Sequence, residues 1–157
     1  MIILISDDDR TSRLTLEGIL KKEGYGVIAT SNGKEAWQAM QGENPPPLAI
    51  IDWIMPEMDG LEFCRKIRES PALSSTYIIL LTAKRQKEDL ITGLESGADE
   101  FIRKPFDRGE LLARLRAAER IIKLQFSLVT QVKELNQELS GLSGAKNPEE
   151  IKEANRF

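Results

Sequence analysis

The chain has 157 residues, with 22 Lys and Arg, 25 Asp and Glu, one cysteine and no histidine. This length suffices for one domain with its own hydrophobic core. Without histidine there is no Ser-His-Asp catalysis, histidine-containing zinc site or internal phosphohistidine, and the single Cys64 excludes an internal disulfide. A reactive site must therefore use carboxylates, hydroxyls, lysines or backbone groups, together with metals that prefer oxygen ligands.

The charge and hydropathy patterns predict neither a membrane segment nor a nucleic-acid-binding segment. The apolar run at residues 1–5 is too short for a signal-peptide core or a transmembrane helix. The net charge is −3, and residues 107–157 carry 9 basic and 8 acidic groups, so there is no basic arm. We expect a cytoplasmic protein that contacts neither nucleic acid nor a membrane.

Five short apolar runs, each followed by a stretch with helical spacing, predict a parallel α/β sheet with helices on both faces. Runs rich in isoleucine, such as 49–51 and 78–81, suit strands that are covered on both sides. Gly24 and Gly97 stand where helices are expected to end. The expected strands are residues 2–6, 27–30, 48–52, 77–82 and 99–103.

The last predicted helix is longer than a sheet-covering helix needs to be. It starts near Asp107, and after Gly109 no proline or glycine interrupts it until Gly141. Seven apolar residues in it are separated by 3, 4, 4, 3, 4 and 3 positions, a nearly heptad pattern. Residues 140–144 predict a flexible break, and residues 147–150 predict the start of a short, marginal helix. The seven residues are Ile121, Leu124, Leu128, Val132, Leu135, Leu139 and Leu142.

Ionisable or hydroxyl side chains stand at the ends of four predicted strands, where open parallel sheets bind their ligands. Asp7 and Asp8 follow the first strand, Asp52 ends the third, Thr82 ends the fourth and Lys104 follows the fifth. Each residue alone has an ordinary interpretation as a helix cap, a turn residue or a surface charge. The complementary set at four strand ends favours a common site.

Three neighbouring carboxylates repel one another unless a cation neutralises them or their pKa values rise. Because this site offers only hard oxygen ligands, the expected ion is Mg²⁺, with Mn²⁺ able to substitute. A carboxylate beside Mg²⁺, a lysine and a hydroxyl supplies the groups needed for phosphoryl transfer onto an aspartate.

Four motifs resemble the receiver domain of two-component response regulators. Residues 3–10, Ile-Leu-Ile-Ser-Asp-Asp-Asp-Arg, resemble its first strand and acidic pair. Residues 52–60, Asp-Trp-Ile-Met-Pro-Glu-Met-Asp-Gly, resemble its phosphoacceptor loop, and residues 81–83 and 97–106 complete the set. The resemblance covers about residues 1–120. It implies a flavodoxin-like, doubly wound (βα)5 parallel sheet with strand order 2-1-3-4-5, here followed by an extended C-terminal helix.

By this resemblance, Asp52 accepts a phosphoryl group from a histidine kinase, a phosphotransfer protein or a small phosphodonor. Asp8 binds Mg²⁺ directly and Asp7 largely through water, and Asp52 and the backbone carbonyl of Ile54 complete the protein ligands. The domain is expected not to be an enzyme, because it assists only its own phosphorylation and autodephosphorylation.

The resemblance also implies a switch. Thr82 hydrogen-bonds the phosphoryl group and Lys104 forms a charge-assisted contact to it. Phe101 matches the family's switch aromatic, which turns inward as Thr82 moves and so reshapes the surface of the fourth helix, fifth strand and fifth helix. Constitutive burial of Phe101 in the core is the alternative. Family members usually have a cis peptide before the proline that matches Pro105.

Some positions depart from the family pattern or vary within the family. Ser6 stands where an apolar residue is usual, and Arg10 stands where proline is common. Ile54 and Lys84 occupy variable positions that influence the phosphoryl lifetime, and neither can orient an attacking water. The expected phosphoaspartate is therefore long-lived.

The chain is expected to divide into a receiver at residues 1–120, a helical extension at 121–142 and a tail at 143–157. The apolar stripe of the extension predicts a homodimer through a parallel coiled coil, in which Gln131 and Asn136 are polar interruptions. Folding back on the receiver and docking on another protein are the alternatives. Similar extensions join receivers to output domains such as diguanylate cyclases, so the chain is either a stand-alone receiver or the N-terminal part of a larger regulator.

Two other classes of function compete with the receiver. One is a Mg²⁺-dependent phosphatase or phosphotransferase that forms an aspartyl phosphate, but Ile54, two residues after Asp52, supplies no second acid. The other is a receiver-like module that binds partners without phosphorylation. The complete set of acidic pair, Asp52, Thr82 and Lys104 disfavours that module.

Overall fold

The computed structural model describes residues 1–83 and 87–143. The chain divides into two compact units, Met1–Ala118 and Glu119–Phe157. The predictions for Lys84, for the tail and for a short helix near residue 147 lie outside the described residues.

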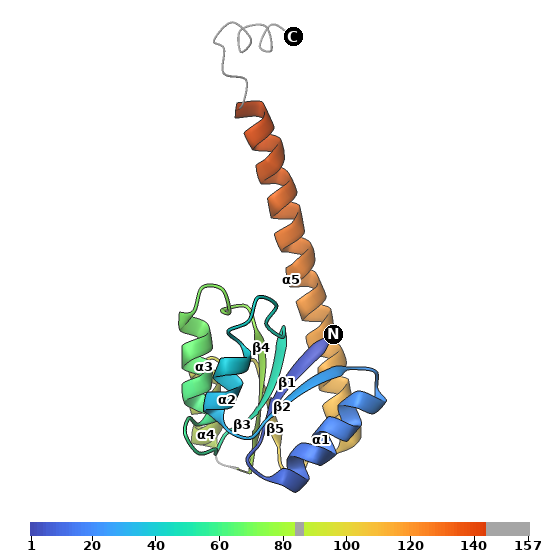
Figure 1. The fold of residues 1–157 in the computed structure, drawn as a ribbon, viewed down its shortest axis with the longest axis vertical. Helices are drawn as coiled ribbons and strands as arrows, with labels where there is room; N and C mark the ends of the chain where they lie inside the picture. Colours follow the sequence, from blue (N-terminus) through green and yellow to red (C-terminus); the bar gives the residue numbers. More distant parts are fainter. Residues whose placement is uncertain (84–86, 144–157) are drawn as a thin grey trace, which may run out of the picture. The chain divides into compact units, whose positions relative to one another are not determined.

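The first unit contains a five-stranded parallel sheet with the strand order β2-β1-β3-β4-β5 (Figure 1). This order confirms the predicted flavodoxin-like, doubly wound fold. Two strand starts differ from expectation by one residue, because the second strand begins at Gly26 and the fifth at Glu100. The strands are β1 (Ile2–Ser6), β2 (Gly26–Thr30), β3 (Leu48–Asp52), β4 (Tyr77–Thr82) and β5 (Glu100–Arg103).

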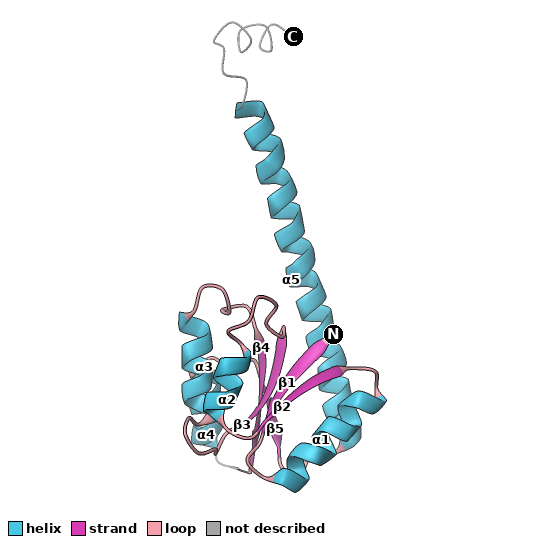
Figure 2. Cartoon of the chain, viewed as in Figure 1, coloured by secondary structure: helices cyan, strands magenta, loops and turns pink. Residues whose placement is uncertain are grey.

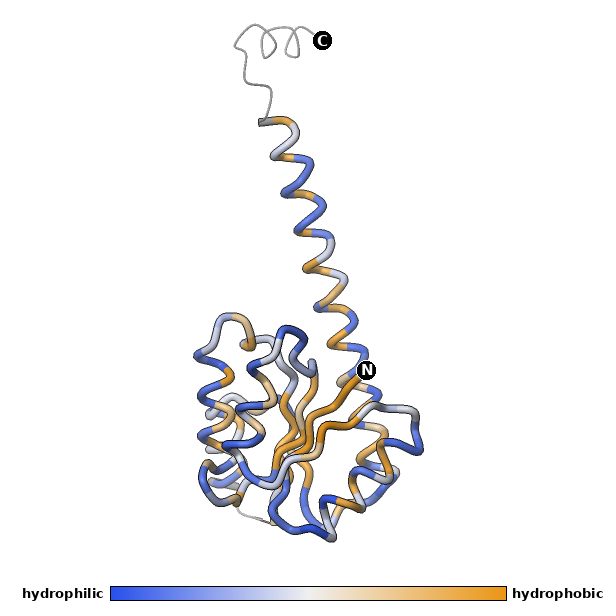
Figure 3. The backbone as a smooth tube through the Cα atoms, in the orientation of Figure 1, coloured by the Kyte–Doolittle hydropathy of each residue, from blue (hydrophilic) through white to orange (hydrophobic). Residues whose placement is uncertain are grey.

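Continuous apolar runs form the inner strands of this sheet. Every residue of β4 is buried, as are the first four residues of β3. The edge strand β2 is more exposed. The strands are accordingly the most hydrophobic part of the backbone trace (Figure 3). Such strands need cover on both faces.

Helices supply that cover and begin at short polar caps (Figure 2). Asp9, Asn32 and Asp59 each accept a hydrogen bond from a backbone N–H in the first turn of α1, α2 and α3. Helices α2, α3 and α4 lie on one face of the sheet, and α1 and the first turns of α5 lie on the other (Figure 1). The helices are α1 (Arg10–Lys22), α2 (Gly33–Ala39), α3 (Gly60–Glu69), α4 (Lys87–Glu95) and α5 (Arg108–Ser143).

Arg68 at the end of α3 joins three segments on the face opposite α1. Its guanidinium donates hydrogen bonds to the carbonyl oxygens of Gly97, Ser74 and Thr76, at 2.8, 2.8 and 2.6 Å. It also pairs with Asp99 at 2.7 Å, and the same carboxylate oxygen accepts the Ile78 N–H at 2.8 Å. Arg68 therefore fixes the end of α3 to the loops before β4 and β5.

We expect Arg68→Met to lower the free energy of unfolding by about 2 kcal/mol, because several partly buried acceptors lose their donor. Urea denaturation measures this change. The exposed Arg65 of the same helix provides the matched control, and Arg65→Met should leave the unfolding midpoint almost unchanged. Equal midpoints for the two variants would show that the Arg68 contacts contribute nothing to stability.

The part of α5 in the second unit is amphipathic. All seven predicted stripe residues are exposed, with exposed fractions of 40% to 75%. The predicted break at residues 140–144 is wrong as far as the structure describes it, because α5 continues through Gly141 to Ser143. A single glycine costs only about 1 kcal/mol in a helix, which its neighbours offset. Among the described residues, no helix combines the length and hydrophobicity needed to cross a bilayer.

Candidate functional site

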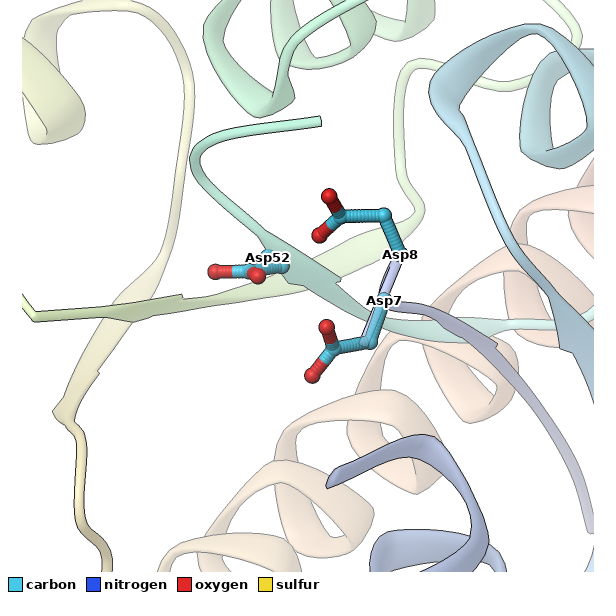
Figure 4. A group of neighbouring side chains, drawn as sticks. All are labelled: Asp7, Asp8 and Asp52. Carbon is cyan, nitrogen blue, oxygen red and sulfur yellow. The ribbon is translucent and has the colours of Figure 1, made fainter. Parts of the chain in front are cut away.

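The carboxyl ends of β1 and β3 bring three aspartates together. The strands are hydrogen-bonded neighbours, with Ser6 opposite Ile51 in the register, so the residues that follow them share one edge of the sheet. One carboxylate oxygen each from Asp7, Asp8 and Asp52 lies within 4.8 Å of the other two. Figure 4 shows the three side chains grouped at this edge.

Lys104, directly after β5, reaches two of these carboxylates. Its Nζ lies 2.7 Å from Asp7 Oδ2 and 3.1 Å from Asp52 Oδ2. Burial opposes the charge of the ammonium, but the bonds to Asp7 and Asp52 outweigh burial and raise the pKa of Lys104. Lys104 therefore remains charged and offsets part of the carboxylate repulsion. The Lys104–Pro105 peptide bond is cis.

The environment of Asp52 makes its carboxyl easier to protonate than that of an ordinary aspartate. Burial raises the pKa of Asp52 to about 6, with Lys104 opposing the shift and Asp7 adding to it. One lysine thus does not fully compensate the acidic cluster. A further cation at this position would favour the ionised, nucleophilic form of Asp52.

The three aspartates fit a small divalent cation. Two oxygens bound to one Mg²⁺ lie at most about 4.2 Å apart. The separation of up to 4.8 Å therefore suits direct ligation by some carboxylates and ligation through water by others. Asp7 is the natural water-mediated partner, because its Oδ1 already accepts the Asp9 N–H at 3.0 Å and its Oδ2 accepts from Lys104.

Because Asp52 titrates near pH 6, Mg²⁺ binding should weaken on acidification. A protonated carboxyl is a poor ligand, so a group with a pKa near 6 raises the apparent Kd roughly tenfold between pH 7 and pH 5. Calorimetric titrations with Mg²⁺ at these two pH values measure the change. A Kd that is constant over this range would contradict the role of Asp52 as a ligand.

Thr82 and Phe101 lie on the neighbouring strands. Thr82 ends β4 and is 1% exposed, and its carbonyl oxygen accepts the Lys104 N–H at 2.7 Å. Phe101 of β5 is half-buried and meets Trp53 edge to face, with ring centroids 5.8 Å apart. Gly93 of α4 borders both rings, and an added Cβ there would lie 2.6 Å from Phe101 Cε2. The missing side chain of Gly93 therefore makes room for the ring pair.

Sequence reasoning did not find two residues that support the acidic cluster. Arg13 of α1 donates a hydrogen bond from Nη1 to the Asp7 carbonyl oxygen at 2.9 Å. The sequence feature that could have identified Arg13 is its position one turn after Asp9, the cap residue of α1. Ser6 was noticed only as a departure from the family pattern, whereas its hydroxyl contacts the loop that follows Asp52.

The chain belongs to the response regulator receiver domain family, whose sequence model matches residues 3–116. Receiver domains generally bind Mg²⁺ through an acidic pocket, and Asp7, Asp8 and Asp52 form such a pocket here.

Similar proteins include the transcriptional regulatory protein GltR of Pseudomonas aeruginosa, 42% identical over 127 residues, covering 81% of this chain and 51% of GltR. The response regulator RppA of Synechocystis is 37% identical over 121 residues, covering 76% of this chain and 51% of RppA. The chain thus spans about half the length of the curated relatives it matches.

Among solved structures, a receiver domain of a signal transduction histidine kinase from Syntrophus aciditrophicus superimposes with a TM-score of 0.69 and 37% identity. The match covers 74% of this chain and 88% of that one. A CheY-like receiver protein from Methanospirillum hungatei gives a TM-score of 0.72 at 27% identity, covering 79% and 97% of the two chains.

Proposed function

We propose that this protein is a cytoplasmic signalling switch in which Asp52 accepts a phosphoryl group from a partner histidine kinase, a phosphotransfer protein or a small phosphodonor. The observation that carries the proposal is the contact of Asp52 Oδ2 with Lys104 Nζ at 3.1 Å inside a three-aspartate cluster. A lone surface aspartate has neither the adjacent ammonium nor the cation-binding oxygens.

In the proposed reaction, a carboxylate oxygen of Asp52 attacks the phosphorus atom while the bond between phosphorus and the donor breaks. The electron pair of that bond leaves with the donor group. Asp7, Asp8, Asp52 and the Ile54 carbonyl would hold Mg²⁺, which supplies neutralisation of phosphoryl charge when bound. Lys104 stays protonated and stabilises the negative charge on the phosphoryl oxygens.

Phosphorylation would then redistribute the contacts of Lys104 and Thr82. The new group carries a charge of about −1.5 to −2 and three acceptor oxygens. Lys104 exchanges its present bond to Asp52 for one to the phosphoryl group, and Thr82 moves toward it. The half-buried Phe101 would shift further inward as Thr82 moves. The response is a change in the surface of α4, β5 and α5.

A pocket of about 530 Å³ next to Lys104 is the proposed docking place for the phosphodonor protein. Lys104 lines this pocket and also contacts Asp52, so it connects the proposed docking place with the acceptor. The apolar side chains Ile19, Pro105 and Phe106 suit a helical partner. Thr11, Ser12, Thr15, Ala83 and Arg108 complete the lining.

The test of this function is intact-mass spectrometry after incubation with acetyl phosphate. We expect the wild-type chain to gain one phosphoryl group with Mg²⁺ and none with EDTA. The Ile54 side chain is exposed and bears no group that could orient water, so the adduct should persist for longer than seconds after the donor is removed. Failure of the protein to react with acetyl phosphate and with histidine kinases would exclude the phosphoacceptor role.

We further propose that the helical extension, residues 121–142, joins two copies of the chain in a parallel coiled coil. Its seven stripe residues are 40% to 75% exposed. Together they leave an apolar stripe exposed along the helix, and such a stripe marks an interaction surface. A second copy supplies an identical stripe and so covers every position of the first.

The order of residues in the stripe supports two strands. From Leu128 onward, leucines occupy the d positions 128, 135 and 142, and Val132 and Leu139 occupy the a positions. Val132, a β-branched a residue with leucine at the neighbouring d positions, favours parallel dimers, whereas Leu139 at the other a position adds no such preference. Gln131 and Asn136 fall at g and e, beside the seam. Upstream, the apolar residues from Ile121 to Val132 are spaced by 3, 4 and 4 positions. Compared with a regular heptad, this spacing corresponds to an insertion of four residues, which locally unwinds a coiled coil.

We also propose that α5 connects the receiver to the output of this protein. Relatives named as transcriptional regulators, such as GltR, are about twice as long as the matched region. The expectation that nucleic acid is not contacted therefore concerns the receiver domain alone. An extended α5 suits a connection to an output domain such as a diguanylate cyclase, and size analysis of the endogenous gene product distinguishes this arrangement from a stand-alone receiver.

A further inference from the structure

The loop between β3 and α3 contains a strained turn. Glu57 at its tip has a φ of 69°, a conformation that favours glycine. The Met58 N–H donates to the Pro56 carbonyl oxygen at 2.8 Å across Glu57, as in the strained form of the three-residue γ-turn. Such a conformation persists only where the surrounding structure holds it.

The ends of this loop are held by the sheet. The Trp53 N–H donates to the Leu81 carbonyl oxygen at 2.9 Å, and the Gly60 N–H donates to the Trp53 carbonyl oxygen at 2.8 Å. Ile54, whose carbonyl is a proposed Mg²⁺ ligand, comes next, and its side chain is 64% exposed. The side chain of Ile54 therefore cannot anchor it, so its carbonyl direction depends on its neighbours.

Ser6 anchors the next residue, Met55. Ser6 is fully buried at the end of β1, and its hydroxyl lies within hydrogen-bond distance of Met55 Sδ, at 3.1 Å, and of the Asn32 carbonyl oxygen, at 3.0 Å. The strand pattern calls for an apolar residue here, and a buried hydroxyl is unfavourable unless it is bonded. Ser6 thus connects β1, the start of α2 and the β3–α3 loop.

The start of α2 supports the other side of the turn. Gly33, directly after Asn32, packs so closely on the loop that an added Cβ would collide with the Met58 carbonyl oxygen. Met58 itself is buried. The strained turn is therefore held at Met55 by Ser6 and at Met58 by the segment that Ser6 also bonds.

We propose that Ser6 is a positioning residue for the cation site, acting through Met55 and Asn32 to hold the Ile54 carbonyl toward the acidic cluster. This inference rests on the proposed function. Ser6 itself donates no ligand and does not contact the phosphoryl group. Loss of its hydroxyl frees Met55 and lets the strained turn relax, so the Ile54 carbonyl is no longer held in one direction.

The test compares Mg²⁺ binding by calorimetry in the full chain for wild type, Ser6→Ala and Ser6→Cys. Removing an outer partner of a metal ligand costs roughly tenfold or more in affinity, so Ser6→Ala should raise the Mg²⁺ Kd by about that factor. Ser6→Cys retains a weak donor and should recover part of the loss. Amide hydrogen exchange at Met58 should accelerate in Ser6→Ala.

Thr30→Val is the matched control. Thr30 lies opposite Ser6 in the sheet, and its buried hydroxyl donates to the Ile5 carbonyl oxygen at 2.8 Å, away from the loop. This variant should lose stability but keep the wild-type Mg²⁺ affinity. An unchanged Kd in Ser6→Ala, or an equal loss in Thr30→Val, would overturn the positioning role. Absence of Mg²⁺ binding in wild type would instead refute the proposed function.

Discussion

Asp52→Asn should abolish phosphorylation by acetyl phosphate, so that the intact mass stays unchanged while wild type gains one phosphoryl group. The amide nitrogen that replaces one oxygen is not nucleophilic, and the neutral side chain loses its charged contact with Lys104, now 3.1 Å away. The variant should remain folded, because it removes a carboxyl whose charge burial disfavours. In the absence of a metal at neutral pH, its melting temperature should exceed that of wild type.

Asp59→Asn is the matched control for this loss. Asp59 lies seven residues further along the same loop and caps α3 by accepting the Glu62 N–H at 2.8 Å. Asparagine caps a helix about as well as aspartate, so this variant should react like wild type. Phosphorylation of Asp52→Asn at another residue would assign the acceptor elsewhere, and equal losses in both variants would indicate a general effect of charge.

The second large effect is expected in the helical extension. Replacing both Leu128 and Leu135 by glutamate should convert a dimer into a monomer, as measured by light scattering at tens of micromolar protein. Both residues occupy d positions, and each pair of facing carboxylates would lie in the apolar seam without a counter-charge. The receiver should still accept a phosphoryl group, because neither residue belongs to the unit that contains Asp52.

A control with the same kind of change lies on the outer face of the helix. Gln137 occupies an f position, so Gln137→Glu should leave the dimer mass unaltered. The measurement is repeated with beryllofluoride as a phosphate mimic, to cover a dimer that forms only in the activated state. A monomeric mass for wild type under both conditions would eliminate the coiled coil. The apolar stripe would then be covered by the receiver itself or by another protein.

Local patterns in the sequence predicted the strands and the polar residues at their ends. Runs such as Ile78–Leu81 are apolar on both faces, which only a covered parallel strand accommodates. The strand ends then follow from the register, and the carboxyl-end rule places Asp7, Asp52 and Lys104 at one edge. The strand order, which brings these ends together, came from the resemblance to receiver domains, because pairing between strands joins residues that are distant in the chain.

Contacts between distant segments were not predictable in the same way. Arg68 bonds to Gly97 and Asp99, about thirty residues away, and Ser6 meets Met55, 49 positions along the chain. None of these contacts produces a periodic pattern in the sequence, because each depends on the positions that the loops take once the sheet has formed. The close packing of the Trp53 and Phe101 rings against Gly93 likewise joins three separate segments, and no local pattern marks it.

The position of Lys104 implies a trade-off. Its ammonium already serves as a counterion for Asp7 and Asp52, so it competes with any divalent cation for the same oxygens. Lys104→Gln should therefore tighten Mg²⁺ binding, which calorimetric titration measures, and a Kd unchanged from wild type would show that the ammonium does not compete with the cation. A resident counterion lets the acidic cluster exist before a metal arrives, and it is already in place to transfer to the phosphoryl group. In the proposed function, one side chain would thus set the cation concentration at which the site loads.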